Sequence, residues 1–280
     1  MCGIAGVVRL DPRVPPASRE EALLMAGRLR HRGPDGQAAW TSPCGSCALG
    51  HARLKVIDLE TGDQPMGNED GSVQVVFNGE IYNFQALRAE LEARGHRFRT
   101  RSDTEVLVHG WEEWGEHLPE HVDGMFAFAV WEQSRRRLFL ARDRAGKKPL
   151  FWTRSAGRLA FASEIKALVA LPWVADEVDR AALPFYLAFG YVPGPGTFYA
   201  GIRKLPPATW MAVEGDAESR RRYWTLDWDP APDGPSEEEA TAGVRTLLGD
   251  AVERRLIADV PLGAFLSGGI DSTLIVGAMR

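Results

Sequence analysis

The residue best suited to chemistry in this sequence is Cys2, which directly follows the initiator methionine. If an aminopeptidase removes Met1, Cys2 carries a thiol and a free α-amine only a few atoms apart. An α-amine with a pKa of ~7.7–8.0 is available as a base near neutral pH, whereas a thiol at ~8.5 is only partly ionised. One residue then supplies a nucleophile and its base, as in N-terminal threonine enzymes. The terminus therefore predicts attack on an amide carbonyl without a catalytic histidine, and retention of Met1 would remove the base.

Such a nucleophile needs donors for the negative charge that develops on the attacked oxygen. In "FNGEIYN", the Asn78 amide and the Gly79 N–H can both donate, and losing one such donor costs ~100- to 1,000-fold in rate. A free amino acid substrate also calls for an arginine and one or two acids, and Arg53, Glu80 and Asp103 fit those roles. Each of these three residues could instead form a surface ion pair or a cap, and Asp103 in particular could be a helix N-cap.

A second candidate site is "SGGIDS", which follows an apolar stretch and precedes another. A strand, a glycine-rich turn and a helix start would direct backbone N–H groups and the positive end of a helix dipole at one spot, which suits a phosphate. Ser267 and Ser272 add hydroxyl donors, and Asp271 suggests a bridging divalent cation. The segment lacks the GxxxxGK[ST] pattern of a P-loop. An ordinary strand-to-helix turn explains it equally well.

The remaining cysteines give no comparable signal. Cys44 and Cys47 have redox-motif spacing, but neither a second CxxC nor paired histidines accompany them, so we predict a turn between two strands. A net charge of -5 argues against a nucleic-acid partner. No apolar run approaches the ~20 residues of a membrane span, and no secretory signal is visible. We therefore expect a cytoplasmic protein with reduced thiols.

The elements that must position these residues are mostly short strands separated by Gly, Asn and Asp turns. Seven strands are predicted, in "GIAGVVRL", "CALGHARLKVID", "VQVVFNG", "MFAFAVWE", "RRLFLARD", "PLFW" and "RLAFAS". Helices are predicted after Ser18, whose spacing to Glu21 is that of a capping box, in "NFQALRAELEARG" and from "SDTEVLVHGWEEW". This pattern favours an α+β fold of antiparallel sheets with helices on their outer faces.

Composition changes after about residue 170, and the prolines at 230, 232 and 235 mark a linker at 230–236. A long amphipathic helix is predicted from Ser236, with Val244, Leu247, Leu248 and Ala251 on its apolar face. We expect a strand in "DVPLGAFL" and an apolar segment after "SGGIDS". The predicted domains are residues 2–218 and 236–280.

Taken together, ten segments in order resemble the glutamine-dependent asparagine synthetase family. They are "MCGIAG", "RHRGPDG", "LGHARLKVIDL", "QPM", "VFNGEIYN", "SDTE", "DGMFAFA", "ARDRAGKKPLF", "ASEIKAL" and "VPLGAFLSGGIDS". The resemblance implies a class II glutamine amidotransferase domain with the N-terminal-nucleophile hydrolase fold, a four-layer αββα sandwich. The start of an α/β parallel-sheet ATP pyrophosphatase domain would follow it.

The resemblance also implies residue roles. Cys2 would be the nucleophile, and Asn78 and Gly79 the oxyanion hole. Glutamine would be bound by Arg53 through its α-carboxylate, by Glu80 and Asp103 through its ammonium, and by a pocket stretch of Leu54, Lys55, Val56 and Ile57. "HRGPDG" would shape a nearby loop, and His51 would be structural. The glutaminase half would need no cofactor and no metal site.

In the second half, the resemblance implies that ATP with Mg²⁺ activates L-aspartate as an adenylate, which ammonia converts to L-asparagine. The ATP loop would comprise Leu266, Ser267, Gly268, Gly269, Asp271 and Ser272. Because the chain stops eight residues after Ser272, we expect either a fragment of a longer protein or a natural truncation, with at most glutaminase activity. The apolar residues near the end should be exposed or disordered. Alternatives are another carboxylate acceptor, as in natural-product or polysaccharide pathways, and a non-catalytic relative. A homodimer is left open.

Overall fold

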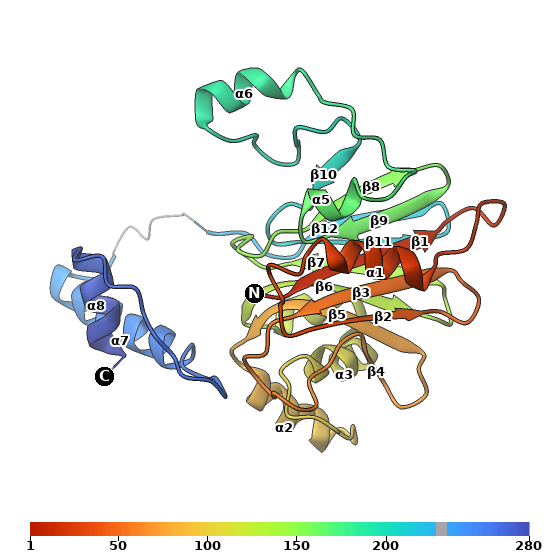
Figure 1. The fold of residues 1–280 in the computed structure, drawn as a ribbon. Coiled ribbons are helices and arrows are strands. Elements are labelled where there is room, and N and C mark those ends of the chain that lie inside the picture. Colours follow the sequence, from red (N-terminus) through yellow and green to blue (C-terminus); the bar gives the residue numbers. More distant parts are fainter. Residues whose placement is uncertain (228–233, 280) are drawn as a thin grey trace.

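A computed structural model of the chain describes residues 1–227 and 234–279. Two six-stranded antiparallel sheets lie face to face (Figure 1). The first contains, in spatial order, β10 (Ile202–Lys204), β8 (Phe151–Ser155), β9 (Arg158–Ala162), β1 (Gly3–Arg9), β3 (Cys47–Arg53) and β2 (Gly36–Thr41). The second contains β12 (Ala217–Arg222), β11 (Thr209–Glu214), β7 (Arg137–Arg142), β6 (Gly124–Glu132), β5 (Val73–Ile81) and β4 (Met66–Gly67).

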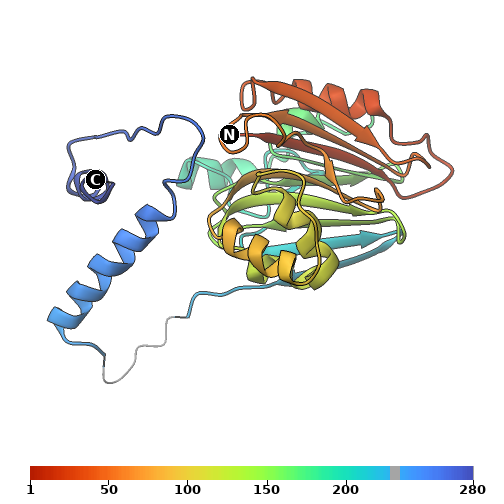
Figure 2. The same ribbon diagram turned by 90° about the horizontal axis from the view of Figure 1, so that it is seen from below.

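Helices cover both outer faces of this sandwich. The first sheet packs against α1 (Arg19–Gly27) and α5 (Ile165–Leu168). The second packs against α2 (Phe84–Ala93), α3 (Glu105–Trp114) and α4 (Leu118–His121), and the 3₁₀ turn η1 (Gly115–His117) joins α3 to α4. Three helices project from the sandwich: α6 (Ala182–Phe189), α7 (Glu237–Glu253) and α8 (Ile270–Ala278) (Figures 1 and 2). The predicted αββα sandwich of antiparallel sheets is confirmed.

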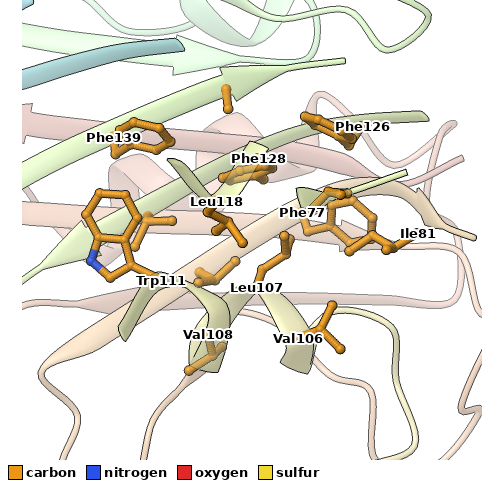
Figure 3. Close-up of a cluster of buried hydrophobic side chains, with 14 of the residues drawn as sticks. Phe77, Ile81, Val106, Leu107, Val108, Trp111, Leu118, Phe126, Phe128 and Phe139 are labelled. Atoms are coloured by element: carbon orange, nitrogen blue, oxygen red, sulfur yellow. The ribbon is translucent and has the colours of Figure 1, made fainter. Parts of the chain in front are cut away.

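The core is divided into three apolar layers, one at each interface of the sandwich. On β6, Phe126, Phe128 and Val130 face the helices, whereas Ala127 and Trp131 face the other sheet. This alternation follows from the two-residue period of a strand. Figure 3 shows the phenylalanines of the second sheet against the apolar face of α3. Because both faces of β6 are buried, its sequence reads as one continuous apolar run.

Local signals located most elements correctly. The predicted capping box is present: Ser18 Oγ accepts from Glu21 N, and the Glu21 carboxylate accepts from Ser18 N. "CGSC" forms the predicted turn between β2 and β3. The predicted strand 47–58 ends at Arg53, and β2, β4, β10, β11 and β12 were not predicted. The edge strand β12 escaped prediction because its residues are all exposed and lack an apolar alternation.

The C-terminal segment differs most from expectation. The linker prediction falls partly on residues 228–233, which lie outside the described residues. The predicted strand over "DVPLGAFL" is wrong: residues 259–266 form no strand, because no neighbouring strand offers its backbone a ladder. The expected exposure of apolar residues is confirmed, with Phe265 fully exposed and Ile270 80% exposed. Within the described residues, no helix has both the length and the apolar character needed to cross a membrane.

Candidate active site

A cavity of about 120 Å³ opens at one end of the sandwich, where segments from both sheets meet. Its lining contains almost every residue predicted to bind or transform an amino acid, namely Cys2, Arg53, Leu54, Val56, Ile57, Asn78, Gly79, Glu80 and Asp103. Lys55 is the exception. Its backbone N–H donates to Asp35 Oδ2 at 2.9 Å, and it lines a neighbouring cavity with Asp35 and Asp63.

Cys2, which carries the thiol, directly precedes β1. Pairing of Gly3 with Ala52 sets Cys2 beside Leu54, so that Cys2 Sγ is 3.4 Å from Leu54 N and 3.6 Å from Leu54 O. Burial raises the pKa of the thiol, against the lowering effects of the Leu54 hydrogen bond and the charged amino terminus. Arg32 Nε donates to Cys2 O at 2.9 Å. A base next to the sulfur is therefore needed to generate a thiolate at neutral pH.

Asn78 and Gly79 come from β5, directly across the sandwich from Cys2. The Asn78 side chain is fully buried, and neither its oxygen nor its nitrogen has a hydrogen-bond partner among the described residues. A buried amide without partners is costly, so this one is available for a bound group. At position 79 an added Cβ would lie 2.2 Å from Met125 O, so only glycine fits.

The ladder pattern places the Gly79 N–H on the open edge of β5. On that edge, Phe77 N donates to Gln64 Oε1 at 2.6 Å and Ile81 N donates to Asp103 Oδ2 at 3.0 Å. Backbone N–H groups along a strand point alternately to its two sides, so Gly79 N points to the same edge as its neighbours at ±2. Its N–H therefore lies between two side-chain acceptors and beside the cavity.

Two carboxylates, Asp103 and Glu80, share one side of the cavity. Asp103 is 6% exposed, and burial raises its pKa to about 7 despite the bond from Ile81 N, with the Glu80 charge adding to the rise. Burial also raises the pKa of Glu80, against the opposing charge of Lys148. Both acids therefore favour a cation beside them. The N-cap of α3 is Thr104, so the alternative reading of Asp103 as that cap is wrong.

Arg53, the last residue of β3, brings a positive charge to the lining of the cavity. It is 5% exposed, donates to Asp63 Oδ1 at 2.6 Å and contacts the carbonyl of Asp58. The Asp63 side chain is 77% exposed. This carboxylate can therefore leave Arg53 for water when a ligand carboxylate arrives, at little cost.

Sequence reasoning assigned no chemistry to two basic residues at or near the cavity, Lys148 and Arg32. Lys148 is 4% exposed, lines the cavity and donates from Nζ to Met1 Sδ at 3.1 Å. Burial lowers its pKa. Arg32, which holds the Cys2 carbonyl, also pairs with Glu164 at 2.9 Å. Both lie in segments quoted for the family resemblance, but a basic residue in a turn is too common to stand out.

The segment after α7 returns to the cavity wall, which the sequence did not predict. Asp259 N donates to Val56 O at 2.9 Å, and Asp259 Oδ2 accepts from Asp58 N at 2.7 Å. Nearby, Arg254 pairs with Asp123, and Arg255 lies over the Tyr82 ring at 4.4 Å. The cavity loop 54–58 thus contacts both Cys2 at the N-terminus and the segment after α7.

The predicted ATP loop lies apart from this cavity, and none of its residues lines it. Gly269 is the N-cap of α8, Gly268 has a φ of +81°, and Ser267 Oγ lies 3.0 Å from Ser272 Oγ. Two hydroxyls and the N–H groups of a helix start suit a polyphosphate. Asp271, in the first turn, is the loop's one carboxylate for a divalent cation.

Comparisons with known proteins identify the family to which the chain belongs. Residues 1–224 match the family described as "Glutamine amidotransferase domain", and residues 243–280 match "Asparagine synthase". The chain is 41% identical to asparagine synthetase [glutamine-hydrolyzing] 3 of Bacillus subtilis, over 98% of this chain and 44% of that protein. It is 33% identical to a putative asparagine synthetase of Methanocaldococcus jannaschii, over 100% of this chain and 57% of that protein.

The chain therefore spans about half the length of the curated relatives it matches. Among solved structures, the glutamine phosphoribosylpyrophosphate amidotransferase of B. subtilis, complexed with ADP and GMP, superposes with a TM-score of 0.59 at 17% identity. That comparison covers 99% of this chain and 64% of the other, and it supports the fold. The match to residues 1–224 shows that this chain belongs to the glutamine amidotransferase domain family.

Proposed function

We propose that the chain hydrolyses L-glutamine to L-glutamate and ammonia, with Cys2 as the nucleophile once Met1 is removed. The observation that carries the proposal is the meeting, in one small cavity, of the Cys2 thiol with the unpartnered, fully buried amide of Asn78. These groups come from different sheets, so only the folded chain brings them together.

In this reaction the α-amine of Cys2 takes the thiol proton, and Sγ attacks the side-chain carboxamide carbon. Asn78 Nδ2 and the Gly79 N–H donate to the oxyanion that forms. The amine returns the proton to the leaving nitrogen, so ammonia departs and a thioester remains. Water then cleaves the thioester, which releases glutamate and restores the thiol.

Charges around the cavity orient the substrate. Arg53 binds the α-carboxylate in place of Asp63, and the ammonium lies between Glu80 and Asp103. The raised pKa values of these two acids support a cationic neighbour, because a cation stabilises both as anions. Leu54, Val56 and Ile57 form the wall, whereas Lys55 lines the neighbouring cavity.

The whole protein is proposed to be a glutamine-hydrolysing asparagine synthetase of the cytoplasm that uses L-aspartate as acceptor. The names of the relatives and the match of residues 243–280 support this. Ser267, Gly268, Gly269 and Ser272 would hold the phosphates of ATP, Asp271 would hold Mg²⁺, and Leu266 leads into this loop. ATP supplies the activation of the acceptor carboxylate.

The test is a glutaminase assay on the purified chain, with mass spectrometry of its N-terminus. Cys2→Ala should abolish glutamate release and leave the unfolding transition in place. Cys44→Ala removes another partly buried free thiol outside the cavity and should keep full turnover. Unchanged turnover of Cys2→Ala, or full activity in protein that retains Met1, would refute the assignment.

A further inference from the structure

Outside the cavity, three side chains lie close together in the outer layer of helices. His109 and Glu112 lie on one face of α3 at i, i+3 spacing, and His96 comes from the segment that joins α2 to α3. His109 Nδ1 is 3.0 Å from Glu112 Oε2, and His96 Nδ1 is 3.5 Å from the same oxygen. The three ligand atoms lie within 4.8 Å of one another.

The distances from the two imidazole nitrogens to Glu112 Oε2 are close to those around a tetrahedral metal ion. With Zn–N of about 2.0–2.1 Å and Zn–O of about 2.0–2.2 Å, ligand atoms in a tetrahedron lie about 3.3–3.5 Å apart. The observed distances of 3.0 and 3.5 Å bracket that range. A small shift of side chains would therefore complete three-sided coordination.

The remaining polar atoms of each ligand side chain also have polar neighbours. His96 Nε2 lies 2.9 Å from Glu113 Oε1, and His109 Nε2 faces Glu105 Oε1 at 3.7 Å. Asn68 Nδ2 donates to the other oxygen of Glu112 at 2.8 Å. Carboxylates behind metal-ligating imidazoles fix ring orientation and increase ligand basicity. His96 has that arrangement, and His109 Nε2 has the Glu105 carboxylate as an ion-pair neighbour.

We propose that His96, His109 and Glu112 bind a divalent transition-metal ion, with zinc as the best fit. Two imidazoles and one carboxylate suit zinc better than magnesium or calcium, which prefer oxygen ligands. His109 is 2% exposed and anchors the site, whereas Glu112 and His96 keep 28% and 16% of their side chains exposed, so an ion can enter from solvent. Water completes the coordination.

The site would act as a clip. Its ligands enclose residues 97–108, which include Asp103 of the cavity and the start of α3. A metal joining His96 to α3 therefore fixes both ends of the segment that delivers Asp103.

The test is titration of the full chain, free of affinity tags, with Zn²⁺ alone by calorimetry, and with Co²⁺ followed by its visible absorption. We expect one ion per chain and the intense bands of tetrahedral Co²⁺. His96→Ala should weaken Zn²⁺ binding at least about tenfold, the lower bound for losing even an outer-shell partner. Glu112→Gln provides a second ligand variant if His96→Ala does not fold.

The matched control is His117→Ala. His117 and Glu120 also form an i, i+3 pair, at 3.2 Å, and His117 is exposed. This variant should bind Zn²⁺ like the wild type. Absence of stoichiometric binding at micromolar Zn²⁺, or equal loss in the His117→Ala control, would overturn the proposal. Tight binding that survives both ligand substitutions would overturn it as well.

Discussion

Replacing Asp103 by asparagine should make the protein more stable and a poorer binder of glutamine. The carboxylate is buried, and its pKa is about 7 in place of 3.8. At about 1.4 kcal/mol per pH unit, the ionised group costs the folded state about 4 kcal/mol above pH 7. Because this pKa is raised, the free protein loses stability as pH rises from about 4 to about 7. Asparagine stays neutral, and its oxygen can still accept from Ile81 N.

Binding should change in the opposite direction. A hydrogen bond between charged groups contributes about 1.5–3 kcal/mol, so losing the ammonium contact should raise the KM for glutamine about 10- to 100-fold at alkaline pH. In the wild type, KM should fall between about pH 6 and about pH 8 as Asp103 ionises. The variant should lack this dependence.

The assays are glutamine hydrolysis and denaturant unfolding, both across this pH range. Asp70→Asn is the control, since Asp70 lies in an exposed turn outside the cavity. A stability gain without a change in KM would remove Asp103 from the ammonium site. A stability loss at about pH 8 would refute the electrostatic reasoning itself.

Two further predictions concern groups that sequence reasoning missed. Lys148→Met removes a buried cation that lines the cavity together with Cys2. Because a nearby cation lowers the pKa of an amine, the acid limb of kcat/KM should move to higher pH in this variant, and an unmoved limb would exclude this role. Asp259→Ala removes the hydrogen-bond acceptor of Asp58 N. This loss should lower the free energy of unfolding by about 1–3 kcal/mol and raise the KM for glutamine more than it lowers kcat. Hydrogen exchange over residues 54–58 should rise with it, and unchanged exchange would contradict the link.

Element positions were largely predictable because local signals agree with the fold. The strand predicted at 73–79 is present as β5, and the helices predicted from Ser18 and Ser236 begin there, each with a capping box in the structure. The strand predicted at 259–266 failed, because an apolar run becomes a strand only beside a partner. The same reasoning explains why the sequence pattern could not separate the loop 54–58 from β3.

The amino-acid sequence by itself determined which groups could perform the chemistry: a cysteine behind the first methionine, an Asn-Gly pair, an arginine and two acids. Residue types and motifs are local features of the chain, so they can be read from a single amino-acid sequence. Only the tertiary structure decided which of them meet, that Asn78 is left without a partner, and that Asp103 is buried deeply enough to titrate near neutral pH. Burial and partner choice depend on pairing between β1 and β3 and on packing of one sheet against the other, which join residues far apart in the chain.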